Sequence, residues 1–322
     1  MTAIEPPGVP DPFEPPISPS GVELGPVLRS RGLWRDAYRS TVRTRSAQVG
    51  LGLLLLLLVL AVFAPLIAPY GPNEVLLSTG VSVREPPCVH IFGCAEDKPQ
   101  HIMGIDGNGR DEFSRIVYGA RLSLLSGVAC VVVALVIGTI LGLVAGFYGR
   151  AADGVIMRCM DVLLAFPALL LAITIVTVLG RGLVNAIVAI SLVSIPVYAR
   201  IVRASVLSVR ELDFVAADRA LGVSNRRILW HRVFPNSLTP LVVQATLGIA
   251  TAVLEVAALS FLGLGVQPPT AEWGSMLAAE RNNVFTAFFL VLFPGIMIMI
   301  NVLAFNLLGD GLRDALDPRL NK

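Results

Sequence analysis

Charged side chains are scarce in this sequence. Of the 322 residues only 15% are Asp, Glu, Lys or Arg, whereas 55% are hydrophobic, and the mean hydropathy is +0.74. A soluble domain of this length needs far more charge to cover its surface. The composition therefore predicts an integral membrane protein. The net charge of +2 gives no sign of a basic surface, so no nucleic acid partner is expected.

Motifs for catalysis and nucleotide binding are missing as well. The sequence has no Gly-x-x-x-x-Gly-Lys-Ser/Thr loop of the kind that cradles phosphates in ATPases, so the chain should not bind ATP itself. It shows no catalytic triad, no metal-hydrolase motif and no paired carboxylates in a cleft. We therefore expect a protein that is not an enzyme and that holds neither a metal nor another cofactor.

Apolar sequence, by contrast, is abundant and comes in runs of about 20 residues, the length that crosses a bilayer. Lipid offers backbone groups no hydrogen-bond partner, so each run should be a helix. Six runs cover approximately residues 49–69, 121–150, 162–180, 183–204, 238–262 and 284–308. The predicted fold is all-α, with a Pro-rich and basic N-terminal segment (1–45), a first membrane helix (46–70), an outer loop (71–120), a five-helix core (121–309) and a tail (310–322).

The placement of arginine predicts the orientation in the membrane. Six arginines precede the first run, four lie within residues 213–236, and the 71–120 loop has an excess of acidic residues. Loops rich in Lys and Arg stay in the cytoplasm. We therefore expect both termini and the 213–236 segment to be cytoplasmic, the 71–120 loop to lie outside, and the chain to cross a plasma membrane several times.

Residues 213–236 form a polar segment between two apolar runs. Asp213 can cap a short helix, whose apolar stripe would consist of Phe214, Ala217 and Leu221. Gly222 can end that helix in a left-handed conformation, and a second helix capped by Ser224 would then run towards Pro235. The pattern favours a docking element lying across the membrane face over a solvated connector.

The same segment resembles the cytoplasmic "EAA" loop of ABC-importer permeases. The triplet reads Ala216, Ala217 and Asp218, and it is followed by Gly222 and by Pro235-Asn236. The glutamate of the family pattern is replaced by Ala216, which puts its usual salt bridge in doubt. Five other stretches resemble the dipeptide, oligopeptide and nickel permeases of the DppC/OppC type, namely "RSAQVGLGLLLLLLVLAVFAPLIAPYGPN", "GIDGNGRDEFSRIVYGARLSL", "MRCMDVLLAFPALLLA", "LSFLGLGVQPPTAEWGSML" and "GDGLRDALDPRL".

The resemblance implies a type I ABC importer permease in a bacterial plasma membrane. A second homologous permease would complete the channel, two subunits binding ATP and Mg would drive it, and an external binding protein would deliver short peptides. Nickel chelates or other small solutes are the alternative cargo. A secondary transporter is the more distant alternative, but no inverted repeat is found. The residues that contact the ATPases, within the coupling loop 207–236, would be Asp213, Phe214, Ala216, Ala217, Asp218, Arg219, Leu221, Gly222 and Pro235.

Several residues outside this loop carry open interpretations. Glu255 lies in an apolar run, where a charge is costly; it either lines a pore or gate or sits at the outer interface after an early helix end. Cys88 and Cys94 could form a disulfide, remain free thiols or, with nearby histidines, bind a metal. Arg158 and Asp161 are spaced to pair on one helix face.

Two further patterns concern packing and the outer surface. Residues 106–121 are polar and helix-like after Asn108, which indicates an amphipathic helix on the outer surface. Gly138, Gly142 and Gly146 recur every four residues in the second run, and small residues at this spacing allow a neighbouring helix to approach closely.

Overall fold

The structure is a computed structural model, and it describes residues 44–92, 94 and 99–316. The predicted segment 1–45 therefore lies almost entirely outside the described residues, as do positions 317–322 of the predicted tail. Within the described part the structure is helical, with only isolated β-bridges. The main helices are α2 (Arg45–Val62), α3 (Ala64–Ile67), α4 (Glu112–Tyr148), α5 (Arg150–Leu164), α6 (Ala168–Leu179), α7 (Leu183–Val209), α8 (Asp213–Ala220), α9 (Asn225–Ile228), α10 (Phe234–Asn236), α11 (Leu238–Phe261), α12 (Trp273–Glu280) and α13 (Phe289–Leu316).

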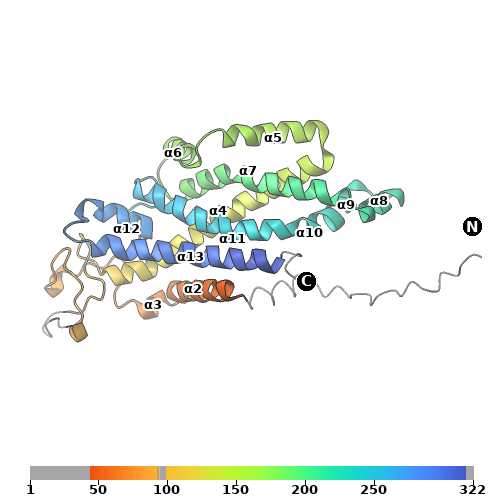
Figure 1. Cartoon of the computed structure of the whole chain (residues 1–322). Helices are drawn as coiled ribbons and strands as arrows, with labels where there is room; N and C mark the ends of the chain where they lie inside the picture. Colours follow the sequence, from red (N-terminus) through yellow and green to blue (C-terminus); the bar gives the residue numbers. More distant parts are fainter. Residues whose placement is uncertain (1–43, 93, 95–98, 317–322) are drawn as a thin grey trace, which may run out of the picture.

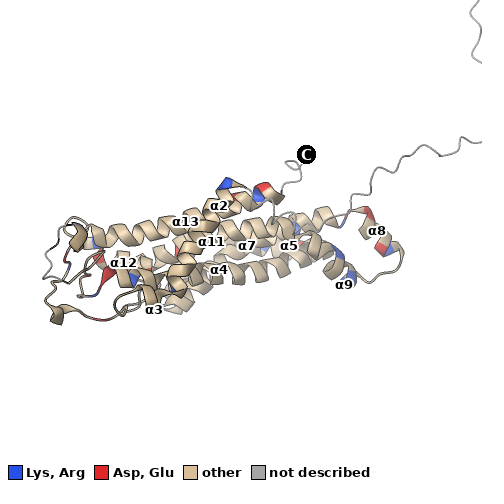
Figure 2. Ribbon diagram, turned by 90° about the horizontal axis from the view of Figure 1, so that it is seen from below, with Lys and Arg blue, Asp and Glu red and all other residues tan. Residues whose placement is uncertain are grey.

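The long helices α4, α7, α11 and α13 run side by side along an elongated bundle (Figure 1). Helices α8 and α9 lie at one end, and α12 with the segment before α4 lies at the other. Charged residues lie mainly in the segment before α4, in α8 and α9 and near the end of α13, and most of the ribbon between them is uncharged (Figure 2). This distribution is the one that a bilayer imposes, because charges are costly in its centre.

Among the described residues, five helices are long and apolar enough to cross a membrane, and the count rises to six if the bent pair α5–α6 forms one span. The predicted run 162–180 is therefore not one straight helix, since α5 and α6 meet at 92°. Pro167 explains the break: a proline disfavours helical geometry at the preceding residue, and it can itself lead into a new helix.

Other predicted boundaries also differ from the structure. Helix α4 begins at Glu112 rather than near residue 121, α2 ends at Val62 rather than near residue 70, and α13 continues to Leu316, past the predicted start of the tail at 310. The helix expected after Asn108 begins at Glu112 as part of α4, but its first turns are mostly buried, so the predicted surface position is wrong. There Asp111 caps the helix by accepting a hydrogen bond from the backbone N–H of Ser114 (2.8 Å).

Glycines on α4 bring α7 into close contact. A Cβ atom on Gly138 would lie 2.7 Å from the Cβ of Tyr198, and one on Gly142 would lie 2.5 Å from the carbonyl oxygen of Ala199. A Cβ on Gly146 would lie 2.9 Å from that of Val206. The predicted packing role of the three glycines is confirmed, and their partner is α7, the helix that leads directly into the polar segment.

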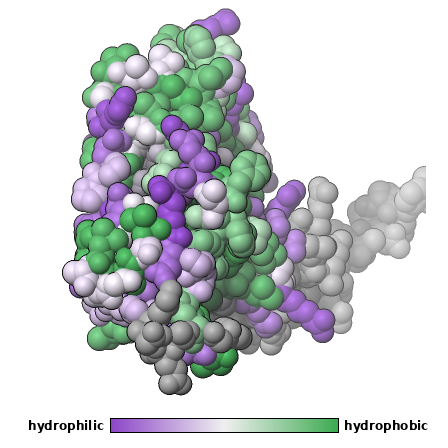
Figure 3. All heavy atoms as spheres, turned by 90° about the vertical axis from the view of Figure 1, so that its left-hand side faces the viewer, coloured by the Kyte–Doolittle hydropathy of each residue, from purple (hydrophilic) through white to green (hydrophobic). Residues whose placement is uncertain are grey.

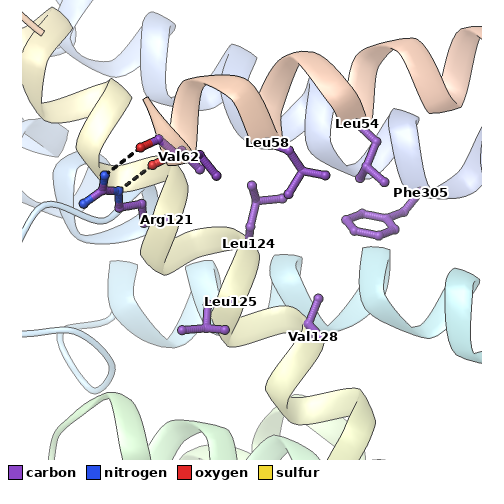
Figure 4. Close-up of a pocket in the computed structure, with 9 residues that line it drawn as sticks. Leu54, Leu58, Val62, Arg121, Leu124, Leu125, Val128 and Phe305 are labelled. Carbon is purple, nitrogen blue, oxygen red and sulfur yellow. Dashed lines mark hydrogen bonds between the residues drawn. The ribbon is translucent and has the colours of Figure 1, made fainter. Parts of the chain in front are cut away.

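Arg121 of α4 holds the end of α2. Its guanidinium donates hydrogen bonds to the backbone carbonyls of Ala61 and Val62, which belong to the last turn of α2 and lack a helical partner (Figure 4). A groove of about 670 Å³ opens beside this contact, lined by Leu54, Leu58, Ala61, Val62, Arg121, Leu124, Leu125, Val128 and Phe305. Apart from Arg121 its lining is apolar, so it offers little to a polar solute.

Candidate functional site

Helix α8 is the first part of the polar segment that follows α7. It begins at Asp213, and the position before it is Leu212, so the expectation that Asp213 caps the helix from outside is wrong. Instead the carboxylate lies in the first turn and Arg219 lies in the last turn. Both placements are favourable, because a helix carries partial positive charge at its start and partial negative charge at its end.

Helix α8 is attached to the bundle by a single buried side chain. Val215 is completely buried, whereas Phe214 is 40% and Leu221 is 81% exposed. Ala216, Ala217 and Arg219 are also exposed or partly exposed. The apolar stripe expected for docking is therefore exposed in the part of the chain that the structure describes, most of all at Leu221.

Gly222 ends α8 in a left-handed conformation, as expected, with φ of +76°. Two hydrogen bonds close the end of the helix: the N–H of Gly222 donates to the carbonyl of Arg219, and the N–H of Val223 donates to that of Asp218, both at 3.0 Å. This is the Schellman pattern, which requires a positive φ at the glycine position. Gly222 thus fixes the direction in which the chain leaves α8.

The second half of the segment is anchored far more firmly than α8. Ile228, Leu229 and Val233 are buried and belong to the same core cluster as residues of α4, α7 and α11. Ser224 occupies the cap position before α9, although its side chain makes no capping hydrogen bond. The segment therefore combines a firmly packed base with a projecting helix.

Pro235 follows a turn of π-helix that spans Leu229–Val233. A proline ring clashes with the carbonyl four residues earlier and brings no N–H, so a widened turn relieves the clash. Side chains add hydrogen bonds to two carbonyls of this turn: the Asn236 side-chain amide donates to that of Arg232 (2.6 Å), and the Ser237 hydroxyl donates to that of Val233 (2.9 Å), which also accepts from the backbone N–H of Ser237. The Pro-Asn pair thus shapes the rigid entry into α11.

An ion pair joins the two halves of the segment. The Arg232 guanidinium donates to the Asp218 carboxylate at 2.8 Å, and both residues, with Val223, Arg227 and His231, line a groove of about 470 Å³. Since Arg232 is more than half exposed, the pair contributes at most about 1 kcal/mol to stability. The third residue of the triplet, Asp218, thus forms a salt bridge even though the triplet lacks its usual glutamate.

Glu255 lies inside α11, which continues to Phe261, so the alternative of an early helix end is wrong. Its side chain lines a hollow of about 160 Å³ between α7, α11 and the break of α5–α6. Tyr198 and Gln244 line the same hollow. The structure thus places an acidic group beside a cavity at membrane depth.

Ion pairs between helices hold α5 against α7. Asp161 pairs with Arg200 (2.6 Å), so the expected pair with Arg158 is not formed. Asp153 accepts two hydrogen bonds from the guanidinium of Arg203. These contacts were missed from sequence because they join positions some 40 to 50 residues apart.

At the opposite end of the bundle, the segment before α4 is cross-linked. Cys88 and Cys94 form a disulfide. No group of three or more His, Cys, Asp or Glu in the described part of the chain could hold a metal ion. Glu280 accepts hydrogen bonds from the Arg84 guanidinium and from the backbone N–H of Gly107, both at 2.9 Å, which ties the segment to α12.

Helix α12 begins at a buried carboxylate. Glu272 accepts hydrogen bonds from the backbone N–H groups of Gly274 (2.9 Å) and Ser275 (2.8 Å). Burial raises the pKa of the Glu272 carboxyl above its ordinary value, and these two hydrogen bonds oppose that shift. The surface of this end of the bundle, where α12 and the segment before α4 lie, has both hydrophilic and hydrophobic patches (Figure 3).

The described residues form a helical membrane bundle with a helix that projects between two spans. The family model for the inner membrane component of binding-protein-dependent transport systems matches residues 138–322, and the model for the N-terminal membrane domain of oligopeptide transport permease C matches residues 32–87. The chain belongs to this family of transport-system permeases, and the resemblance noted from its sequence is confirmed.

Named relatives agree with the family assignment. The dipeptide transport permease DppC of Alkalihalophilus pseudofirmus is 46% identical over 97% of this chain and 96% of its own length. The di/tripeptide permease DppC of Pseudomonas aeruginosa is 46% identical over 89% of this chain and 92% of its own length. The glutathione permease GsiD of Pectobacterium atrosepticum is 41% identical over 92% of this chain and 95% of its own length.

A solved structure supports the fold. One chain of the MetNI methionine ABC transporter, in an inward-facing conformation, matches with a TM-score of 0.52 at 21% identity. The match covers 63% of this chain and 96% of the MetNI chain. The predicted fold class, that of a type I importer permease, is therefore confirmed. The chain is a permease subunit and not an enzyme, and its family implies ATP-binding subunits and a substrate-binding protein as partners.

Proposed function

We propose that this chain forms half of the translocation pathway of an ATP-driven importer for short peptides. The observation that carries the proposal is its similarity, over nearly the full length of both chains, to a permease named for dipeptide transport. Relatives named for di/tripeptides and for glutathione point to the same class of peptide-like cargo. A second, homologous permease would supply the opposite wall of the pathway.

In this proposal α8 is the coupling helix. Two partner subunits bind ATP and Mg, and the exposed stripe of Phe214, Ala217 and Leu221 seats in their surface. When they close on ATP, α8 moves as a rigid body. The closed helix end at Gly222 and the packed turn at Pro235 pass that movement to α7 and α11, so that the pathway opens alternately to either side. No ATP, Mg or other cofactor is held by this chain.

The proposed orientation places α8 in the cytoplasm and the disulfide-linked end outside. Support comes from the arginines of residues 213–236, since such loops are retained inside, and from the Cys88–Cys94 disulfide, which suits oxidising surroundings. The start of α2 and the end of α13 lie towards the same end of the bundle as α8 (Figure 1), which fits cytoplasmic termini. The membrane is then a bacterial plasma membrane, with the external binding protein docking on the end seen in Figure 3.

Reconstitution tests the transport function. The chain, its partner permease, the ATP-binding subunits and the binding protein are assembled in proteoliposomes, and uptake of a radiolabelled dipeptide is measured. We expect uptake that requires ATP and the binding protein, and no uptake from an imposed ion gradient alone. Uptake of a nickel chelate but not of the peptide would reject the peptide assignment, and uptake without the ATP-binding subunits would reject the ABC mechanism.

Labelling at position 221 tests the orientation and the docking. In a Cys159→Ser background, which removes the exposed free thiol, Leu221→Cys should react with a membrane-impermeant maleimide only from the cytoplasmic side. Adding the ATP-binding subunits should reduce that reaction at least tenfold. Ile91→Cys, at a side chain that is strongly exposed at the opposite end, is the matched control and should react only from outside. Equal labelling of position 221 with and without the ATPases would contradict docking by α8.

A further inference from the structure

A polar stripe runs along one face of α11, inside an otherwise apolar helix. Gln244, Gly248, Thr251 and Glu255 recur at intervals of three or four residues, which places them on the same side of the helix. All four line the hollow of about 160 Å³ described above. Residues Ser194 and Tyr198 of α7 and Phe166 at the break of α5–α6 line it as well.

Several of these side chains lack a partner in this chain. Across residues 44–92, 94 and 99–316, no hydrogen bond or ion pair engages the side chain of Ser194, Gln244 or Glu255. A carboxylate at membrane depth is costly unless water, a cation or a partner meets it. The stripe is therefore incomplete as it stands, and Glu255 needs a counterpart from outside the chain.

The chemistry of the hollow indicates which counterpart fits. Glu255 supplies a negative charge, no basic side chain lines the hollow, and the rings of Tyr198 and Phe166 are close at hand. Aromatic faces and carboxylates both attract ammonium groups. Gly248 makes the arrangement feasible, since a Cβ there would crowd the Tyr198 hydroxyl oxygen. The lining thus suits a cationic nitrogen group and disfavours an anion.

We propose that Glu255 is a cation-selecting group of the translocation pathway and binds the ammonium groups of passing substrate. The proposal rests on the transport function proposed above. Every free peptide carries an N-terminal ammonium group, and a lysine side chain adds a second. A peptide with a cationic side chain should therefore pass faster than an anionic peptide of equal size.

Comparing the uptake of a cationic and an anionic dipeptide measures this selection. In the fully assembled complex, maximal uptake rates are compared for Ala-Lys and Ala-Glu at concentrations that saturate the binding protein. Glu255→Gln should lower the ratio of the Ala-Lys rate to the Ala-Glu rate about tenfold, equivalent to about 1.4 kcal/mol. Glu255→Asp should keep most of this ratio. Asp310→Asn, which removes an exposed carboxylate from α13 outside the hollow, is the control and should leave the ratio unchanged.

Labelling keeps the proposal testable if Glu255→Gln does not assemble. In the Cys159→Ser background, Glu255→Cys should react with a cationic methanethiosulfonate reagent in the assembled complex, and Ala-Lys should slow that reaction more than Ala-Glu does. An unchanged rate ratio overturns the proposal, and so does a residue 255 that stays unreactive with and without nucleotide. If the wild-type complex carries neither peptide, the proposed transport function is what fails, and the labelling then decides the role of Glu255 by itself.

Discussion

Replacing Gly222 by proline should abolish ATP-driven uptake while leaving the protein in the membrane. Proline fixes φ near −65°, whereas Gly222 has φ of +76°. Proline at this position also lacks the N–H that donates to the carbonyl of Arg219, and its ring disfavours the near-helical backbone of the preceding Leu221. Helix α8 would then leave the bundle in a different direction. The apolar spans that direct insertion are unchanged.

The measurement separates coupling from assembly. Membrane yield and co-purification with the partner permease should match the wild type, whereas dipeptide uptake and peptide-stimulated ATP hydrolysis should fall at least a hundredfold. Gly222→Asn is the matched control, because Asn tolerates the left-handed region at small cost and keeps its N–H. No side chain or backbone atom of the described residues crowds this position. Full uptake by the proline variant would show that the closed end of α8 is not needed.

Features that a bilayer imposes locally were readable from the sequence. Apolar runs predicted the long helices because their length and composition suffice to define a span. The end of α8 at Gly222 could be predicted because a positive φ favours glycine. The packing role of the α4 glycines could be predicted because close helix approach needs small residues. Each of these predictions depends on neighbours along one helix or one turn.

Features that depend on contacts between helices could not be predicted from the sequence. Asp161 pairs with Arg200 on α7 instead of Arg158 on its own helix, and Asp218 pairs with Arg232. Helical spacing shows which side chains share a face, but it cannot show which helix packs against that face. The bend at Pro167 was hidden for a related reason, since hydropathy measures how apolar a run is and not its direction.

Polarity likewise does not reveal where a residue lies. The sequence around Glu112 and Arg115 predicted a surface helix, yet both residues are buried. Arg115 donates to the backbone carbonyl of Pro72 (2.8 Å), and the neighbouring Arg110 donates to the Asp106 carboxylate (2.7 Å). An internal polar network and a water-facing surface thus give the same sequence pattern, because buried charges also need partners.

Gly142→Leu should prevent stable folding of the membrane bundle. Even the first atom of a side chain at this position would lie 2.5 Å from the carbonyl oxygen of Ala199 and 2.8 Å from the Cβ of Val202. Both obstacles belong to or adjoin the α7 backbone, so α4 and α7 would have to separate. Overpacking costs about 1–3 kcal/mol where side chains can give way, and more is expected here because the backbone must move.

The matched substitution Gly52→Leu distinguishes crowding from the general cost of changing a helix glycine. Gly52 is exposed on α2, and apart from its chain neighbours and the backbone of its own helix turn, no described atom lies within 4 Å of the point that a Cβ would occupy there. We expect wild-type yield and thermal stability for Gly52→Leu, and a strongly reduced yield with early thermal aggregation in detergent for Gly142→Leu. Gly142→Ala should lie between them. Because α7 leads directly into α8, Gly142→Ala should also lose coupling before it loses insertion, so uptake should fall further than membrane yield. Equal loss of uptake and yield would argue that α7 does not transmit movement from α8.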